Sequence, residues 1–328
     1  MRRTLPALSG QLRADDELIV VDNASSDGTA DAIREVVPAA TVIDAGSNLG
    51  YGGGCNLGAD AASAELLVFL NPDATPGEGF RAAIERPLTD GRGWGAWQGL
   101  VTANGGRVIN TRGGVVHFSG IAWAGGAGES VDAAPPAVGE PGFASGACLA
   151  IPRDLFARMG RFPADFFLYH EDVDLSLRVR LAGGRLGVEP AARVDHEYEF
   201  EKGPAKWRQL ERNRWATLIR TYPAGLLALL APALAATELA LLPISIAGGW
   251  FGQKVAAWAD LLRAAPRLRR ERRGIQARRA VAARQFADGL TPDLESPYLG
   301  RAGRSRILRA ALRAYWALVL GLLGSGRA

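Results

Sequence analysis

The chain has 328 residues, enough to bury a full hydrophobic core and to hold one large domain with an appendage. Hydrophobic residues make up 48% of the chain and charged residues 22%, which excludes general disorder. The formal net charge of +4 is unevenly placed, because arginines concentrate in residues 263–284. Beside an apolar segment, such a run favours contact with anionic lipid headgroups over a solvated helix face.

Short aliphatic runs alternate with helical patterns through the first part of the chain. In chain order the sequence predicts a helix over residues 4–13, a strand over 17–21, a helix over 28–37, a strand over 41–43, a helix over 56–64 and a strand over 66–70. Strands and helices of this length in alternation predict a parallel sheet with crossover helices. The glycine-rich residues 48–56 are expected to form a flexible loop that ends at a helix start.

The middle of the chain is rich in glycine. Residues 94–142 carry only short apolar runs separated by turn signals, which predicts hairpins and loops. Residues 144–151 are expected to return to the core, and Pro152 then opens a helix with proline in its first turn.

Residues 171–184 are ambiguous, because apolar side chains alternate strictly, as in a strand. Acidic residues at the start, the helical spacing of Asp174 and Arg178, and a pair of glycines at the end favour a helix. Short strands over 187–188 and 193–194 are expected to follow and to lead to His196.

The last third of the chain is helical and apolar. A helix over residues 206–220 precedes residues 224–247, which are nearly all apolar but contain two prolines and Glu238. The length fits a membrane span, an interfacial or re-entrant helical hairpin, or a buried pair of core helices. Residues 307–323 predict a second apolar helix that is interfacial. We therefore expect a catalytic domain over residues 1–222 and a membrane-associated helical region over 223–328.

Cysteine usage and the first residues bear on the cellular compartment. Cys55 and Cys148 lie far apart, and their spacing indicates neither a disulfide framework nor a metal site. Residues 1–4 contain no apolar core of signal-peptide length, which predicts a cytosolic catalytic domain.

Acidic side chains follow two predicted strands, and an acidic pair, Glu171 and Asp172, lies further along the chain. Asp22 follows the strand over 17–21 directly, and Asp73 follows the strand over 66–70. Open α/β sheets bind their ligands at the carboxyl ends of their strands. Together with Asp172, these carboxylates suggest a nucleotide, a metal and a proton acceptor. An Asx turn is the structural alternative for Asp22.

Five motifs, VDNASSDGT, NLGYGGGCNLGA, LNPDA, ASGACLAIPRDLF and FFLYHEDVDLSLR, stand in one order with plausible gaps. In combination they resemble the family-2 glycosyltransferases, especially the bacterial rhamnosyltransferase-like branch, over roughly residues 5–225. The resemblance implies an α/β fold of the GT-A type, a doubly wound mixed sheet that binds a nucleotide sugar. Such domains begin with a strand, whereas this chain opens inside the first helix. We therefore expect a sheet lacking its first strand beside residues 17–21, with a misplaced start codon favoured over a lost strand.

The resemblance also implies roles for individual residues. Asp172 would be the general base, and Glu171 would position the acceptor or share in catalysis. The donor would be bound by Asp22, Asn23, Asn48, Asn56, Asn71 and Arg212. Asp73 and His196 would hold a divalent cation, Mg²⁺ or Mn²⁺, although Asn71 stands where related enzymes often have a first aspartate. Alternatively, Arg212 is an arginine on a solvated helix face.

These expectations combine into one function with two alternatives. We expect an inverting, metal-dependent transferase that moves rhamnose or another hexose from a nucleotide-diphosphate donor to a lipid-linked or cell-surface glycan. It would work at the cytoplasmic face of the cell membrane and would bind no nucleic acid. A nucleotidyltransferase shares the sheet and the metal but requires a basic glycine-rich loop at the first strand. A membrane-attached scaffold that has lost donor binding is the non-enzymatic alternative.

Overall fold

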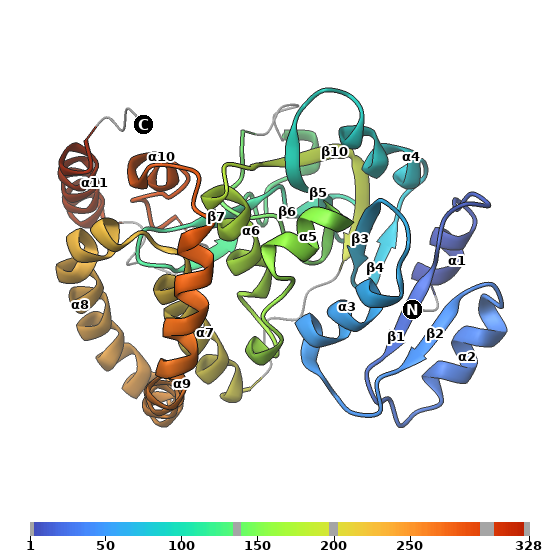
Figure 1. The fold of residues 1–328 in the computed structure, drawn as a ribbon, viewed down its shortest axis with the longest axis horizontal. Coiled ribbons are helices and arrows are strands. Elements are labelled where there is room, and N and C mark those ends of the chain that lie inside the picture. The colour runs from blue at the N-terminus through green and yellow to red at the C-terminus, as the bar shows by residue number, and fades with distance from the viewer. Residues whose placement is uncertain (1–2, 134–138, 197–202, 296–304, 325–328) are drawn as a thin grey trace.

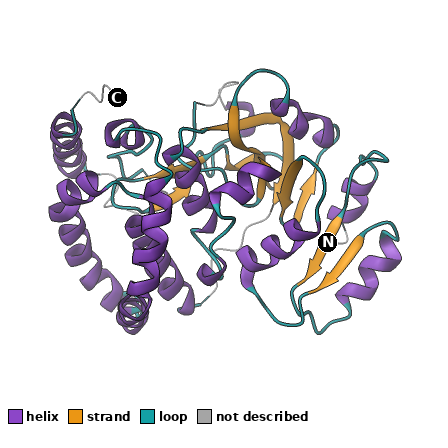
Figure 2. Cartoon of the chain, viewed as in Figure 1, coloured by secondary structure: helices purple, strands orange, loops and turns teal. Residues whose placement is uncertain are grey.

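The computed structural model describes residues 3–133, 139–196, 203–295 and 305–324. Strands and helices alternate in the first two thirds of the chain, and helices alone fill the last third (Figure 1; Figure 2). The strands are β1 (Ile19–Asp22), β2 (Thr41–Asp44), β3 (Leu66–Leu70), β4 (Ala74–Pro76), β5 (Trp94–Ala103), β6 (Val108–Thr111), β7 (Gly114–Val116), β8 (Ala122–Ala124), β9 (Cys148–Pro152) and β10 (Arg185–His196).

The helices surround these strands and continue beyond them. They are α1 (Thr4–Ser9), α2 (Thr29–Val36), α3 (Gly50–Ala61), α4 (Phe80–Glu85), α5 (Arg153–Met159), α6 (Glu171–Leu181), α7 (Ala205–Thr221), α8 (Ala224–Ala247), α9 (Phe251–Ala277), α10 (Ala283–Ala287) and α11 (Arg306–Leu322). Short 3₁₀ turns occupy Arg86–Leu88, Val131–Ala133 and Ala164–Phe166.

The central sheet is mixed and has the strand order β3-β9-β5-β10-β4, with β6 paired to β5. The β5–β10 pair is parallel, whereas β9 and β4 run antiparallel to their neighbours. The sheet is therefore mixed, as the resemblance implied, and the β1–β2 unit supplies the parallel pair expected from the first strands.

The prediction of hairpins over residues 94–142 is confirmed for the antiparallel pair β5–β6, but it missed the length and burial of β5. Residues 94–103 form β5, a ten-residue strand in the middle of the sheet, with its central residues buried. The ring of Trp97 is fully buried and donates to the carbonyl of Ile84 at 2.8 Å. Glycines in this strand lie where other chain segments approach closely, as Gly99 does beside the carbonyl of Ala192. The hairpin prediction is confirmed for β7 and β8.

Two other expectations were close but need correction. The helix α3 begins at Gly50, so most of the predicted flexible loop is helical and buried. Packing outweighs the low helix propensity of its glycines. The two short strands after α6 are parts of one strand, β10, which a register shift between Glu189 and Arg193 interrupts. The helix predicted for residues 171–184 is confirmed as α6, and its strand-like alternation arises because nearly all of its residues are buried.

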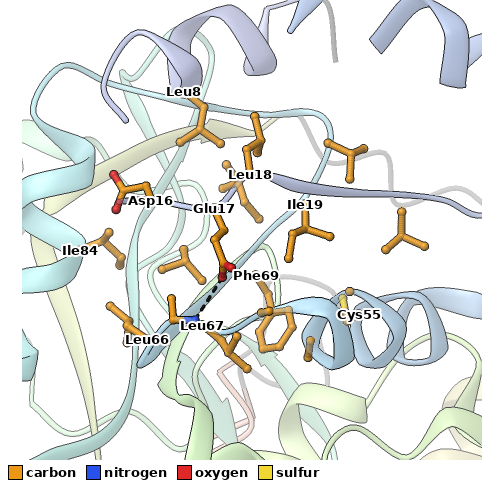
Figure 3. Close-up of a pocket in the computed structure, with 18 of the residues that line it drawn as sticks. Leu8, Asp16, Glu17, Leu18, Ile19, Cys55, Leu66, Leu67, Phe69 and Ile84 are labelled. Atoms are coloured by element: carbon orange, nitrogen blue, oxygen red, sulfur yellow. Dashed lines mark hydrogen bonds between the residues drawn. The ribbon is translucent and has the colours of Figure 1, made fainter. Parts of the chain in front are cut away.

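The strands β1 and β2 form a separate two-stranded sheet. Among the described residues, β1 pairs only with β2, and β3 pairs only with β9. Between β1 and β3 lies a cavity of about 750 Å³. Figure 3 shows its mostly apolar wall, to which Ile19, Leu67 and Phe69 contribute. The edge of β1 that we expected to lack a neighbour therefore faces a hollow.

The C-terminal helices α8 to α11 gather at the end of the molecule opposite β1 and β2 (Figure 1). A single core cluster joins them to α6 and to the β7–β8 hairpin, because Val173 of α6 and Val116 of β7 pack in it with Leu230 of α8 and Trp316 of α11. The predicted domain boundary at residue 222 falls inside this cluster. Within the described part of the chain, only α8 has the length and apolar composition of a membrane span, and 17% of its most apolar window is buried.

Candidate active site

Two residues predicted to bind a metal meet at one edge of the central sheet. The register of β4 against β10 pairs Ala74 with His196, which brings Asp73 next to the histidine. The Oδ1 atom of Asp73 lies 3.2 Å from Nε2 of His196. The imidazole is almost fully buried, whereas the carboxylate is 63% exposed. Nδ2 of Asn71 lies 3.4 Å from the same imidazole nitrogen.

This pair of side chains suits a hard divalent cation that keeps other ligands. No group of three or more histidine, cysteine, aspartate or glutamate side chains in the described ranges is arranged to hold a metal ion. The protein would therefore supply one carboxylate oxygen and one imidazole nitrogen, from Asp73 and His196. Magnesium sites commonly take their remaining ligands from water and substrate phosphates. The residues present fit such a cation.

Three of the predicted donor-binding residues surround the end of β1. The Oδ1 atom of Asp22 accepts a bond of 3.0 Å from the backbone N–H of Ser25, so this oxygen stabilises the turn after β1, whereas the Asx turn before α2 is formed by Asp27. Asn23 donates to Oδ1 of Asn48 at 3.2 Å and accepts from the N–H of Leu49 at 2.8 Å. The two asparagines thus tie the loop after β1 to the start of α3.

Asp172 lies in the first turn of α6 and is held by a glycine from another part of the chain. Its Oδ2 atom accepts a bond of 2.9 Å from the N–H of Gly146, and its Oδ1 accepts from the N–H of Val173. Burial raises the pKa of Asp172, and these backbone bonds act in the opposite direction. Burial, together with the charge of Asp172, raises the pKa of Glu171 well above its usual value. Glu171 therefore holds its proton to higher pH than an exposed glutamate.

Tyr51 and Gly146 were missed by the sequence reasoning. The hydroxyl of Tyr51 donates to the carbonyl of Gly146 at 2.6 Å, on the same residue whose N–H binds Asp172. The next residue, Ala147, accepts a bond of 3.1 Å from the N–H of Asn71. Both residues lie within the conspicuous glycine-rich motifs, yet nothing in their spacing marks them as contacting each other.

The segment 145–147 therefore links all parts of the candidate site. It contacts Asp172, the candidate base, and Asn71, which lies beside the metal pair. Through Tyr51 it also contacts residues 48–51 at the start of α3, which we call the donor loop. Ser145 anchors this segment to the central strand β5, because its N–H donates to the side chain of Gln98 at 2.8 Å.

The side chains of Asn56 and Arg212 bind backbone atoms of the chain before α6. Asn56 lies on α3, and its amide both donates to and accepts from the backbone of Phe162. Arg212 lies on α7, where it donates to the side chain of Asn213 and to the carbonyls of Asp165 and Phe166. Both side chains thus support the chain before α6, and their predicted roles at the donor stay predictions.

Comparison with known proteins adds independent information. Residues 1–113 match the model of glycosyl transferase family 2. Over 228 residues the chain is 29% identical to the N-acetylglucosaminyl-diphospho-decaprenol L-rhamnosyltransferases of Mycobacterium tuberculosis strains CDC 1551 / Oshkosh and ATCC 25618 / H37Rv. These alignments cover 62% of this chain and 73% of each relative.

The fold resembles that of a solved glycosyltransferase. The crystal structure of GalNAc-T7 with UDP, GalNAc and Mn²⁺ has a TM-score of 0.54 to this chain at 16% sequence identity. The match covers 71% of this chain, which spans about half (48%) of the length of that enzyme.

The mixed sheet and this likeness define a GT-A-like α/β fold with a C-terminal helical appendage. The protein is a glycosyltransferase. Its first 113 residues match family 2, and the chain is similar to the rhamnosyltransferases, as the five motifs implied.

Proposed function

We propose that this protein transfers rhamnose or another hexose from a nucleotide-diphosphate donor to a lipid-linked or cell-surface glycan. The transfer inverts the configuration at the sugar, depends on Mg²⁺ or Mn²⁺, and takes place at the cytoplasmic face of the cell membrane. The observation that carries the proposal is the segment 145–147, whose contacts join Asp172, the donor loop and the Asn71 side of the metal pair.

The chemistry requires one proton acceptor and one leaving group. An acceptor hydroxyl forms a bond to the anomeric carbon while the bond from that carbon to the diphosphate breaks, and its electron pair leaves with the nucleoside diphosphate. The hydroxyl proton passes to Asp172, which the bond from Gly146 holds in place. Glu171 lies beside it and positions the acceptor; burial and the charge of Asp172 raise the pKa of Glu171.

The donor is proposed to lie between the end of β1 and the Asp73–His196 pair. Asp22 uses one carboxylate oxygen in the turn to Ser25, and its other oxygen is proposed to bind the base or the ribose. Asp73 and His196 would hold the divalent cation, and GalNAc-T7 was solved with UDP and Mn²⁺. When bound, such a cation neutralises negative charge on the diphosphate.

A lipid-linked acceptor is supported by the mycobacterial relatives, whose name specifies a diphospho-decaprenol sugar. The surface of α8 also supports a location at the membrane. Helix α8 packs one face against the core through residues such as Leu226 and Leu230, while Leu239 and Ile246 are 67% and 64% exposed. We propose that this exposed face lies in the membrane interface, with the arginines of residues 263–284 near anionic headgroups.

The decisive experiment tests transfer with defined donors and a defined acceptor. Purified protein is incubated with Mn²⁺, a panel of nucleotide hexoses and a polyprenyl-diphosphate-linked amino sugar, and products are identified by mass spectrometry. We expect transfer from a nucleotide-linked deoxyhexose, and none with the Asp172→Asn variant. Transfer by this variant at the wild-type rate, or failure of every nucleotide sugar to react with any glycan acceptor, would contradict the proposal.

A further inference from the structure

The chain enters α6 through a strained turn over residues 166–170. Phe167, Tyr169 and His170 have φ angles of +65°, +70° and +67°, in the left-handed region that side chains rarely adopt. Phe167 also has a ψ angle of −59°, which places it in the rare, strained form of the γ-turn. Such conformations persist only where surrounding contacts over-determine them. The turn is therefore held from outside.

Asn213 of α7 supplies these contacts. Its side chain is fully buried, and its Nδ2 atom lies 3.0 Å from the carbonyl oxygen of Phe166, 2.9 Å from that of Leu168 and 2.7 Å from that of Tyr169. Three carbonyls that face one amide nitrogen account for most of the turn's backbone acceptors. An apolar side chain at this position would remove this donor from the carbonyls of Leu168 and Tyr169.

The neighbouring arginine fixes the orientation of this amide. Nε of Arg212 donates to Oδ1 of Asn213 at 2.9 Å, so the amide oxygen faces the guanidinium and the NH₂ group faces the turn. The same guanidinium donates through Nη2 to the carbonyl of Phe166 at 2.8 Å. The two residues thus act as one unit on the backbone before α6.

The opposite side of the turn rests on the start of α3. The N–H of Tyr51 donates to the carbonyl of Phe167 at 2.7 Å. A Cβ atom on Gly50 would lie only 2.2 Å from that carbonyl oxygen, so the two backbones touch. The turn is therefore clamped between α7 and the donor loop, and it leads directly to Glu171 and Asp172.

We propose that Asn213 is a positioning residue for the transfer reaction. Its amide holds the left-handed turn over residues 166–170, and the turn sets the place of Asp172 relative to the donor loop at Gly50 and Tyr51. The inference rests on the proposed role of Asp172 as general base. Donor binding depends on other residues, so the loss of Asn213 acts on the rate of transfer.

The test compares Asn213→Ser, which keeps one short donor, with the isosteric Asn213→Asp, which places an oxygen acceptor opposite the three carbonyls. For Asn213→Ser we expect turnover at saturating donor to fall about tenfold to 100-fold, as for a small misplacement of a catalytic group. The dissociation constant of the nucleoside diphosphate, measured by calorimetry, stays within about threefold. The acidic limb of the pH profile moves to lower pH, because Asp172 loses part of its burial.

Thr217→Val is the matched control, since Thr217 is a buried residue one turn further along α7. Hydrogen exchange of the peptide covering residues 165–172 gives a readout independent of activity, and we expect faster exchange in both Asn213 variants only. Slow exchange with wild-type turnover in Asn213→Ser would overturn the inference. An active Asp172→Asn protein would instead refute the proposed base, whereas an inactive one beside a fully active Asn213→Ser would refute Asn213 alone.

Discussion

The Oδ1 atom of Asp73 and the Nε2 atom of His196 lie 3.2 Å apart, although they come from opposite ends of the catalytic region. The antiparallel register of β4 and β10 imposes this proximity, because His196 pairs with Ala74. A carboxylate and an imidazole in such contact form half of a cation site that substrate oxygens can complete.

Asp73→Ala is expected to weaken metal-dependent binding of nucleoside diphosphate at least about tenfold, because one charged ligand is lost. Calorimetric titration with and without Mn²⁺ measures the effect, and Asp31→Ala, on an exposed face of α2, is the control. Wild-type activity should vanish in excess chelator and return with Mn²⁺ or Mg²⁺. Full activity in chelator would show that the reaction needs no cation.

Asp172→Asn is expected to lower turnover by about 100-fold or more while donor affinity stays within a few fold, because a base acts on the transition state. A base must be ionised, so activity falls as the pH drops through its pKa. Burial raises that pKa above 3.8, and the acidic limb of the wild-type profile should lie correspondingly higher. Initial rates across pH locate the limb; a limb at or below the value for an exposed aspartate would remove Asp172 from this role.

Glu171→Gln is expected to stabilise the protein while it impairs transfer. The pKa of Glu171 in the folded chain is raised above 4.5, so below that pH the side chain is protonated in both states. As the pH rises, the unfolded chain ionises first, and the wild type loses stability that the glutamine variant keeps. Each tenfold change in proton affinity corresponds to about 1.4 kcal/mol. Urea unfolding over a pH series should show a gap that opens only above pH 4.5.

Gly146→Ala tests the segment that links the site. An added Cβ would lie 2.9 Å from the hydroxyl oxygen of Tyr51, so the ring must shift and the bond from Gly146 to Asp172 weakens. We expect turnover to fall at least about tenfold. Gly139→Ala is the matched control, since nothing lies near its added Cβ. Equal activity of the two variants would show that Tyr51 and Asp172 do not depend on this contact.

Replacing Leu239, Ile244 and Ile246 by serine tests the membrane proposal, because all three are exposed on α8. Wild-type protein should cosediment with phosphatidylglycerol vesicles at low salt, and the triple variant should bind much less, since each lost apolar side chain removes about 1.5–3 kcal/mol of burial. Val36→Ser, exposed on α2, should behave as wild type. Unchanged binding of the triple variant would place the contact elsewhere.

The sequence predicted most elements whose pattern is local. α2, β2, α6 and α8 lie within a few residues of their expected bounds, because turn residues, charge placement and continuous apolar runs in the local sequence determine them. It did not predict the length and burial of β5, whose glycines suggested loops although they lie where neighbouring strands pack closely. It also missed the early start of α3, since burial against the turn at Phe167 depends on residues far away in the chain.

For the candidate site, the sequence identified the residue types better than their partners. Asp73 and His196 were expected together and lie together. Tyr51, Gly146 and Asn213 were not singled out, because each acts through a backbone atom of a distant segment. Backbone atoms are the same in nearly all residue types, so the sequence does not predict which of them a side chain will contact.

The mostly apolar pocket of about 750 Å³ between β1 and β3 leaves the two-stranded sheet weakly packed against the central sheet, and we expect it to respond to hydrostatic pressure first. Unfolding eliminates internal void volume, so pressure favours the unfolded chain in proportion to the space that is lost. The small core behind β1, built around Leu5, Ile33 and Val37, packs separately from the main cluster. Compression should therefore release β1 and β2 first, and with them the loop of Asn23, while the central sheet remains folded.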